Sequence, residues 1–222
     1  MSDRATTPSR ILDASLRLFN ERGYAATTLA EIATAVGIAQ GNLTYHYPTK
    51  RDLVIALEER IRQSRRAHLE NYQFGAVADD YVGLVLLSMN HTWEYRFILR
   101  DLAQFSKNPN ALQRDPDMAS DHAELYDLLR RAKKEGLFRR DLAVDLRVLA
   151  SSLFIVSRYW MDHLREFEGL GVITWADQER GFRHHFAVLL PYLTASARRD
   201  FESAVARASR RLAVEEGRNT NG

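Results

Sequence analysis

The sequence predicts an all-α protein that begins with a group of short helices and continues as a longer helical bundle. Three observations support this fold class. The 222 residues include only 5 prolines and 11 glycines. Alternating apolar and polar runs between turn residues, which strands require, are missing, and apolar residues recur at helical spacing along most of the chain. With 45% hydrophobic residues, the chain can also bury a core, which excludes a disordered or fibrous protein.

Charge and cysteine content restrict the function. The 31 Lys and Arg and the 29 Asp and Glu leave a formal net charge of +2, so any nucleic-acid binding must depend on a local patch. The absence of cysteine excludes disulfides, thiolate metal sites and cysteine nucleophiles. Because we find neither a secretory leader nor an apolar stretch of roughly 20 residues, we expect a cytoplasmic protein.

The first two helices have clear start signals. Thr7 as N-cap and Pro8 in the first turn open a helix that Gly23 ends. Thr28 and Glu31 have the spacing of a capping box, in which each side chain satisfies a backbone group of the first turn. The apolar residues that follow share one narrow face, so a second helix of about two turns is expected.

Two further helices complete the N-terminal group. Gly37 ends the second helix, and a third covers residues 39–47, because Pro48 prevents its continuation. Thr49 then caps a fourth helix that reaches about residue 74. The result is two short helices around a glycine turn, carried on a first helix.

We expect residues 1–50 to form the first domain, the helix at 49–74 to connect, and residues 75–222 to form the second domain. The later helices are inferred from caps, glycines and apolar runs. They are expected around Val82–Met89, at Trp93–Phe105, from Asp115-Pro116 to Glu135-Gly136, from Asp141 to about Phe167, from Thr174 through Leu193, and after Arg198, with a turn at Asn108-Pro109-Asn110.

Two short helices around a turn have the geometry of a helix-turn-helix, whose second helix enters the major groove of DNA. The outward residues of that second helix carry amide, hydroxyl and imidazole groups suited to bases and phosphates. They are Gln40, Gly41, Asn42, Thr44, Tyr45 and His46. Positive charge comes from Lys50 and Arg51, and the helix starts at Thr28 and Thr49 offer backbone N–H groups to phosphates. Tyr47 lies beside Leu43 and is expected in the core.

Several short motifs in this region occur together and in register. They are Ile32-Ala33, Val36-Gly37-Ile38, Gly41-Asn42-Leu43, Tyr45-His46-Tyr47 and Lys50. Together they resemble the DNA-binding domain of the TetR/AcrR family of bacterial regulators, over Thr7 to about Ile61. Two positions depart from the family pattern, because Ala39 replaces a small hydroxyl residue and Tyr47 stands where Phe is usual.

The resemblance implies roles for the helix-turn-helix residues. Gln40, Gly41, Asn42 and Thr44 would read bases, while Thr28, Tyr45, His46 and Lys50 would hold phosphates. It also implies a homodimeric repressor that binds a palindromic double-stranded operator and is released by a small-molecule effector, with no enzyme activity, cofactor or metal. The alternative is a helical protein–protein interaction module that does not bind DNA.

The second domain contains candidates for effector binding and dimerisation. Trp93, Phe97, Phe154 and Trp160 are proposed as walls of an effector cavity. Arg158 is either an anchor for an anionic or oxygen-rich effector or a surface residue with a buried stem. The apolar stripes of the last long helices predict a four-helix dimer interface. Its residues are Leu149, Leu153, Val156, Phe182, Phe186, Leu189, Leu190 and Leu193.

Overall fold

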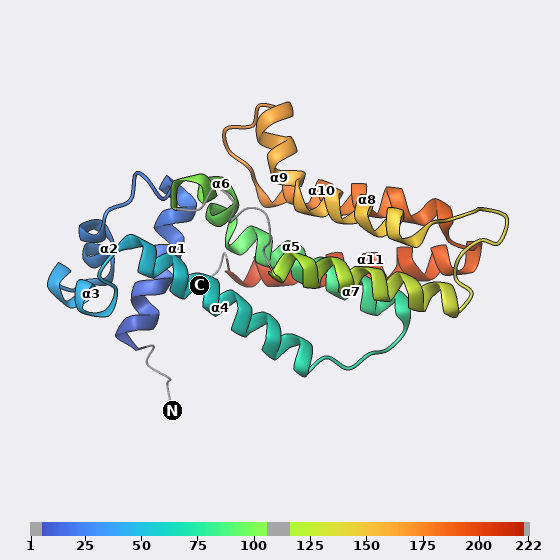
Figure 1. Ribbon diagram of the computed structural model, residues 1–222, viewed down its shortest axis with the longest axis horizontal. Helices are drawn as coiled ribbons and strands as arrows, with labels where there is room; N and C mark the ends of the chain where they lie inside the picture. The colour runs from blue at the N-terminus through green and yellow to red at the C-terminus, as the bar shows by residue number, and fades with distance from the viewer. Residues whose placement is uncertain (1–5, 106–115, 220–222) are drawn as a thin grey trace. The chain divides into compact units, whose positions relative to one another are not determined.

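The computed structural model describes residues 6–105 and 116–219, with side chains placed for residues 6–101 and 120–208 (Figure 1). The described residues form helices joined by loops, as the sequence predicts, and their one extended pairing is an isolated bridge between Phe138 and Leu193. The turn expected at Asn108-Pro109-Asn110 lies outside the described residues.

Contacts divide the described chain into two compact units. Unit 1 contains the residues up to Tyr72 together with residues 94–105, and unit 2 contains residues 73–93 and 116–219. The sequence predicts that everything after residue 74 belongs to the second domain. In the structure, residues 94–105 instead belong to unit 1, because Tyr95 and Phe97 are buried in its core.

Unit 1 is a small helical domain. Its helices are α1 (Thr7–Arg22), α2 (Leu29–Val36), α3 (Gln40–His46), α4 (Lys50–Glu70) and α6 (Arg96–Phe105). Helix α1 packs against α2, α4 and α6, and α2 packs against α3 (Figure 1). Fully buried side chains from all five helices form the centre of the core, including Ile11, Phe19, Ile32, Leu43, Leu57 and Phe97.

The helix boundaries in unit 1 follow their caps. Thr28 and Thr49 form the predicted capping boxes with Glu31 and Asp52. The start of α1 differs by one residue, because the hydroxyl of Thr6, not Thr7, accepts the backbone N–H of Ser9. Helix α4 ends at Glu70, four residues earlier than expected.

A polar network attaches α6 to the end of α1. The buried carboxylate of Asp101 accepts the backbone N–H of Tyr24 at 2.8 Å. Arg100 donates to the carbonyl oxygens of Phe19 and Asn20, which lie in the last turn of α1, where most carbonyls lack an intrahelical donor. The Asn20 side chain in turn accepts the N–H of Phe97 at 3.1 Å.

Unit 2 contains the remaining helices. They are α5 (Val77–Glu94), α7 (Pro116–Lys134), α8 (Leu146–Arg158), α9 (Trp160–Asp162), the π-helical turn η2 (His163–Phe167), α10 (Trp175–Leu189), the 3-10 turn η3 (Leu190–Tyr192) and α11 (Ala195–Asn219). Helix α8 runs alongside α7 on one side and α10 on the other (Figure 1).

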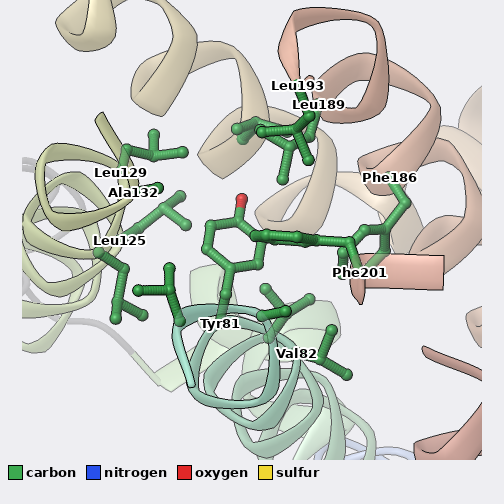
Figure 2. Close-up of a cluster of buried hydrophobic side chains, with 14 of the residues drawn as sticks. Tyr81, Val82, Leu125, Leu129, Ala132, Phe186, Leu189, Leu193 and Phe201 are labelled. Atoms are coloured by element: carbon green, nitrogen blue, oxygen red, sulfur yellow. The ribbon is translucent and has the colours of Figure 1, made fainter. Parts of the chain in front are cut away.

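Tyr81 of α5 lies in the middle of the core of unit 2, and its side chain is fully buried (Figure 2). Figure 2 shows around it side chains from α7 and from the α10–α11 region, namely Leu125, Leu129, Ala132, Phe186, Leu189, Leu193 and Phe201. The phenolic hydroxyl still has a partner, because His185 Nε2 lies 2.8 Å away.

Two expected boundaries in unit 2 need correction. The N-cap of α8 is Asp145, whose carboxylate accepts the N–H groups of Arg147 and Val148, whereas the carboxylate of Asp141 is bound by Arg139. Helix α8 was expected to reach about residue 167. It ends at Arg158, because the backbone of Tyr159 leaves helical geometry (φ −104°, ψ 12°).

Candidate nucleic-acid interface

Helices α2 and α3 meet at a tight turn. Gly37 adopts the left-handed conformation (φ 75°, ψ 39°), which favours glycine. The N–H of Ile38 returns to the carbonyl of Ala33 at 3.0 Å. Leu43 is the one fully buried residue of α3 and attaches the short helix to the core of unit 1. The rest of α3 is therefore available to a partner.

The exposed side of α3 carries most of the predicted base readers. Gln40, Gly41 and Asn42 in its first turn are exposed. Thr44 is half-buried, and its hydroxyl lies 3.2 Å from the carbonyls of Gln40 and Gly41, to which it donates. The side-chain amides of Gln40 and Asn42 can pair with base edges.

Two predicted phosphate contacts lie at the end of α3. Tyr45 is 84% exposed, an unusual environment for an aromatic ring. His46 is half-buried, and its ring centroid lies 5.2 Å from that of Tyr45 in an edge arrangement. Tyr47 packs against the core, as expected.

Gly41 has no steric reason to be glycine within this chain. A Cβ atom built on it meets no heavy atom within 4 Å, and its backbone is helical. Glycine inside a helix costs about 0.5–1 kcal/mol relative to alanine. Close approach of another molecule to the backbone of α3 would explain the residue.

Lys50 serves the fold of unit 1 in this structure. Its Nζ donates to the carbonyl oxygens of Tyr24, Ala25 and Thr27 at 2.7, 3.4 and 2.8 Å. The ammonium also lies 4.5 Å from the centroid of the Tyr24 ring, and burial lowers its pKa. An ammonium has three donors, so the phosphate role implied for Lys50 competes with these three bonds. Arg51, the neighbouring cation, is exposed.

Thr28 is likewise engaged within the chain. Its hydroxyl accepts the N–H of Glu31 and lies 2.8 Å from a carboxylate oxygen of that residue. The hydrogen bonds from Thr28 lower the pKa of Glu31. A phosphate at the start of α2 would therefore meet the positive end of the helix, because the Thr28 hydroxyl is already engaged.

In unit 2, one predicted effector wall, Trp160, lines a small cavity of about 20 Å³. The sequence does not predict the other lining residues, because neither their type nor their spacing distinguishes them from ordinary helix residues. They are Val85, Ser88, Met89, Thr92, Ser157, Gln178, Gly181 and Phe182.

The other four proposed effector residues lie elsewhere. Phe97 is buried in the core of unit 1, against Phe19, so it is no part of a cavity in unit 2. Trp93 packs edge-on against Trp175, with 5.8 Å between centroids. Phe154 packs against the core and the ring of His122, and Arg158 lies over Tyr159.

Most residues predicted for the dimer interface are buried within unit 2 itself. Leu149, Leu153, Phe182, Phe186, Leu189 and Leu193 belong to its core, and only Val156 and Leu190 are half-buried. The outward face of α8 instead presents Val148 and Ile155, and Tyr159 follows at its C-cap; these residues are 62%, 56% and 48% exposed. The sequence pattern located the apolar helices but could not separate their inner from their outer side.

Two other kinds of site are missing from the described part of the chain. No group of three or more His, Asp or Glu side chains there is placed to hold a metal ion. Within the same residues, no helix is both long and apolar enough to cross a membrane.

Comparison with known families identifies this arrangement. The model of a domain described as a bacterial transcriptional repressor, TetR, matches residues 57–201, and that of the bacterial regulatory proteins of the tetR family matches residues 11–57. The chain belongs to the TetR family. The second match contains the helix-turn-helix, and the resemblance noted in the sequence is confirmed.

Individual relatives with helix-turn-helix names agree with this assignment. The regulator AcrR of Shigella flexneri is 39% identical over 64 residues, which cover 29% of this chain and 29% of AcrR, less than two thirds of its length. The repressor KstR2 of Mycobacterium tuberculosis is 27% identical over 68% of this chain and 79% of its own. A solved TetR-family regulator from Marinobacter aquaeolei shares the fold, with a TM-score of 0.70, 22% identity, and coverage of 91% of this chain and 98% of that one.

Proposed function

We propose that this TetR-family chain is a homodimeric repressor that binds a palindromic operator through α3 and leaves it when a small molecule binds unit 2. The observation that carries the proposal is the exposed first turn of α3. There an unexplained helical glycine, Gly41, stands between two exposed amide side chains, Gln40 and Asn42. Amides can read base edges, and a glycine lets the backbone approach the DNA closely.

Dimerisation would provide the specificity that one short helix lacks. A single helix-turn-helix contacts few base pairs, and twofold symmetry places two of them on successive turns of the duplex. We propose that the exposed apolar face formed by Val148 and Ile155 of α8 and by Tyr159 at its C-cap pairs with its copy, together with the outer face of α10. The name of KstR2, a repressor, supports repression as the direction of control.

Chain connectivity supports a route for effector release. Helix α5 provides four of the cavity-lining residues, and the chain passes from α5 through Tyr95 directly into α6. Helix α6 is attached to α1 by Arg100 and Asp101. An effector that changes the position of α5 would therefore act, through α6, on the domain that carries α3. It can release DNA only if it binds the released state more tightly.

Selection of bound sequences from random DNA with the purified protein tests the proposal. A repeated, inverted half-site is expected. Binding should also weaken steeply as salt concentration rises, since phosphate contacts release counterions. Failure to enrich any sequence would contradict operator binding and leave the interaction-module alternative.

A further inference from the structure

We propose that unit 2 binds an uncharged molecule with a hydroxyl or amide group, and that Gln178 is the residue that anchors it. The inference rests on the effector response proposed above and names the class of molecule involved. It starts from the cavity bounded by α5, α8, α9 and α10, whose volume of about 20 Å³ leaves room for roughly one water molecule.

Gln178 is the polar group in this cavity that most needs a partner. The residue is only 2% exposed, yet its side-chain oxygen Oε1 has no hydrogen-bond partner in the structure. A buried polar atom without a partner is rare and destabilising. A guest that donates a hydrogen bond here would satisfy it, and three hydroxyl side chains, Ser88, Thr92 and Ser157, line the same cavity.

The surroundings favour an uncharged guest. Among the described residues that line the cavity, none carries a charged side chain, and the remaining walls are apolar or aromatic. His185 lies behind Ser157, with Nδ1 2.8 Å from the serine hydroxyl, and burial keeps the imidazole neutral by lowering its pKa to about 4. A carboxylate or ammonium would lose its hydration here without gaining an opposite charge.

Trp160 forms one wall of the cavity. The residue is separated from the end of α8 by Tyr159 alone and opens a helix of only three residues. Its Nε1 donates to the carbonyl of Asp177 at 2.8 Å, and its ring lies so close to Gly181 that a Cβ there would be 2.5 Å from Cδ1. A guest larger than water would enter by moving this ring, so tryptophan fluorescence should report binding.

Three small aromatic probes test the class of ligand. Benzyl alcohol, toluene and benzoate share a ring but differ in hydroxyl and charge, and each is titrated into the full-length protein at pH 7 without DNA. Benzyl alcohol is expected to bind at least tenfold more tightly than benzoate. In the Gln178→Met variant, benzyl alcohol should bind roughly tenfold more weakly, while toluene binding stays unchanged and shows that the cavity persists.

The matched control is Gln63→Met, the same substitution at an exposed glutamine of α4, which should change none of the affinities. Benzoate binding as tightly as benzyl alcohol, no binding of benzyl alcohol, or unchanged affinity in Gln178→Met would each overturn the proposal. Because the titrations contain no DNA, these results are independent of operator binding. A protein that selects an operator but ignores benzyl alcohol would contradict the ligand class and not the proposed repressor function.

Discussion

Single residues in unit 1 divide between those that build the fold and those that the fold leaves unexplained. Lys50 and Thr28 belong to the first group, since their polar atoms are bound within the chain. Gln40, Gly41 and Asn42 belong to the second, since they are exposed on a helix attached by Leu43 alone. Substitutions in the two groups should therefore have opposite signatures in stability and in DNA binding.

Gly41→Ala should separate folding from binding. Alanine fits the free protein and favours helix, so the melting temperature should not fall and the gain in stability should be at most about 1 kcal/mol. Operator binding should weaken about tenfold or more, because the new methyl group keeps the DNA from the backbone. Gly171→Ala, at an exposed glycine of unit 2 that also has free space around it, should leave binding unchanged. Equal operator affinity in both variants would show that α3 does not contact the operator.

Lys50→Ala should act mainly on stability. Loss of three charge-assisted hydrogen bonds to the Tyr24–Thr27 loop should destabilise unit 1 by about 1–3 kcal/mol, measured by thermal melting. Arg51→Ala should instead leave stability nearly unchanged and lower the slope of log affinity against log salt by about one. A stable Lys50→Ala protein with a reduced salt slope would assign the phosphate contact to Lys50 after all.

At the scale of elements, buried polar and aromatic contacts join the helices of unit 2. His185 of α10 lies 2.8 Å from both the hydroxyl of Tyr81 in α5 and that of Ser157 in α8. Trp160 attaches α9 to α10 through its indole N–H and its contact with Gly181. These contacts determine how the four helices are placed around the cavity, and the contacts of His185 and of Trp160 each lead to a testable prediction.

His185 should make the stability of unit 2 depend on pH. Its pKa is about 4 when folded and 6.5 as the unperturbed value. The unfolded chain therefore binds the proton first, and stability should fall as pH falls from about 6.5 toward 4, by about 2–4 kcal/mol in total. His185→Gln should lose this dependence, while His184→Gln, at the exposed neighbour, should keep it. Denaturant melts at several pH values would show whether both variants behave alike, which would contradict the assignment.

Gly181→Ala should displace the Trp160 ring, because the added Cβ would lie 2.5–2.9 Å from three of its atoms. We expect a loss of about 1–3 kcal/mol, typical of overpacking, and a shift in tryptophan fluorescence. In a Trp160→Ala background the same substitution should cost far less, since the methyl group then has room. Additive losses in this double-mutant cycle would show that the two residues are not in conflict.

At the scale of the whole molecule, the proposed dimer depends on which apolar residues point outward. Ile155 is 56% exposed on α8, whereas Leu189 is fully buried. Ile155→Asp should yield folded monomers with weakened operator binding, and Leu189→Asp should unfold unit 2. Analytical ultracentrifugation and circular dichroism distinguish these outcomes. A dimer that survives Ile155→Asp with unchanged affinity would place the interface elsewhere.

Local signals in the sequence determined the helix-turn-helix. The capping boxes at Thr28 and Thr49, the left-handed glycine at Gly37 and the apolar position of Leu43 each act over a few residues, so short-range pattern is enough to define them. The same pattern identified the family and the exposed residues of α3. It could not show that the Lys50 ammonium returns to a loop more than twenty residues earlier.

Tertiary structure alone decided which side of each helix is used in unit 2. A stripe of apolar residues shows that a helix is amphipathic but does not tell a core face from a partner face, because both are apolar. Hence Leu189 and Phe186 proved to be core, Phe97 joined the other unit, and Ile155 emerged on the surface. The need of Gln178 for a partner was equally invisible in the sequence, since a missing hydrogen bond is a property of the assembled fold.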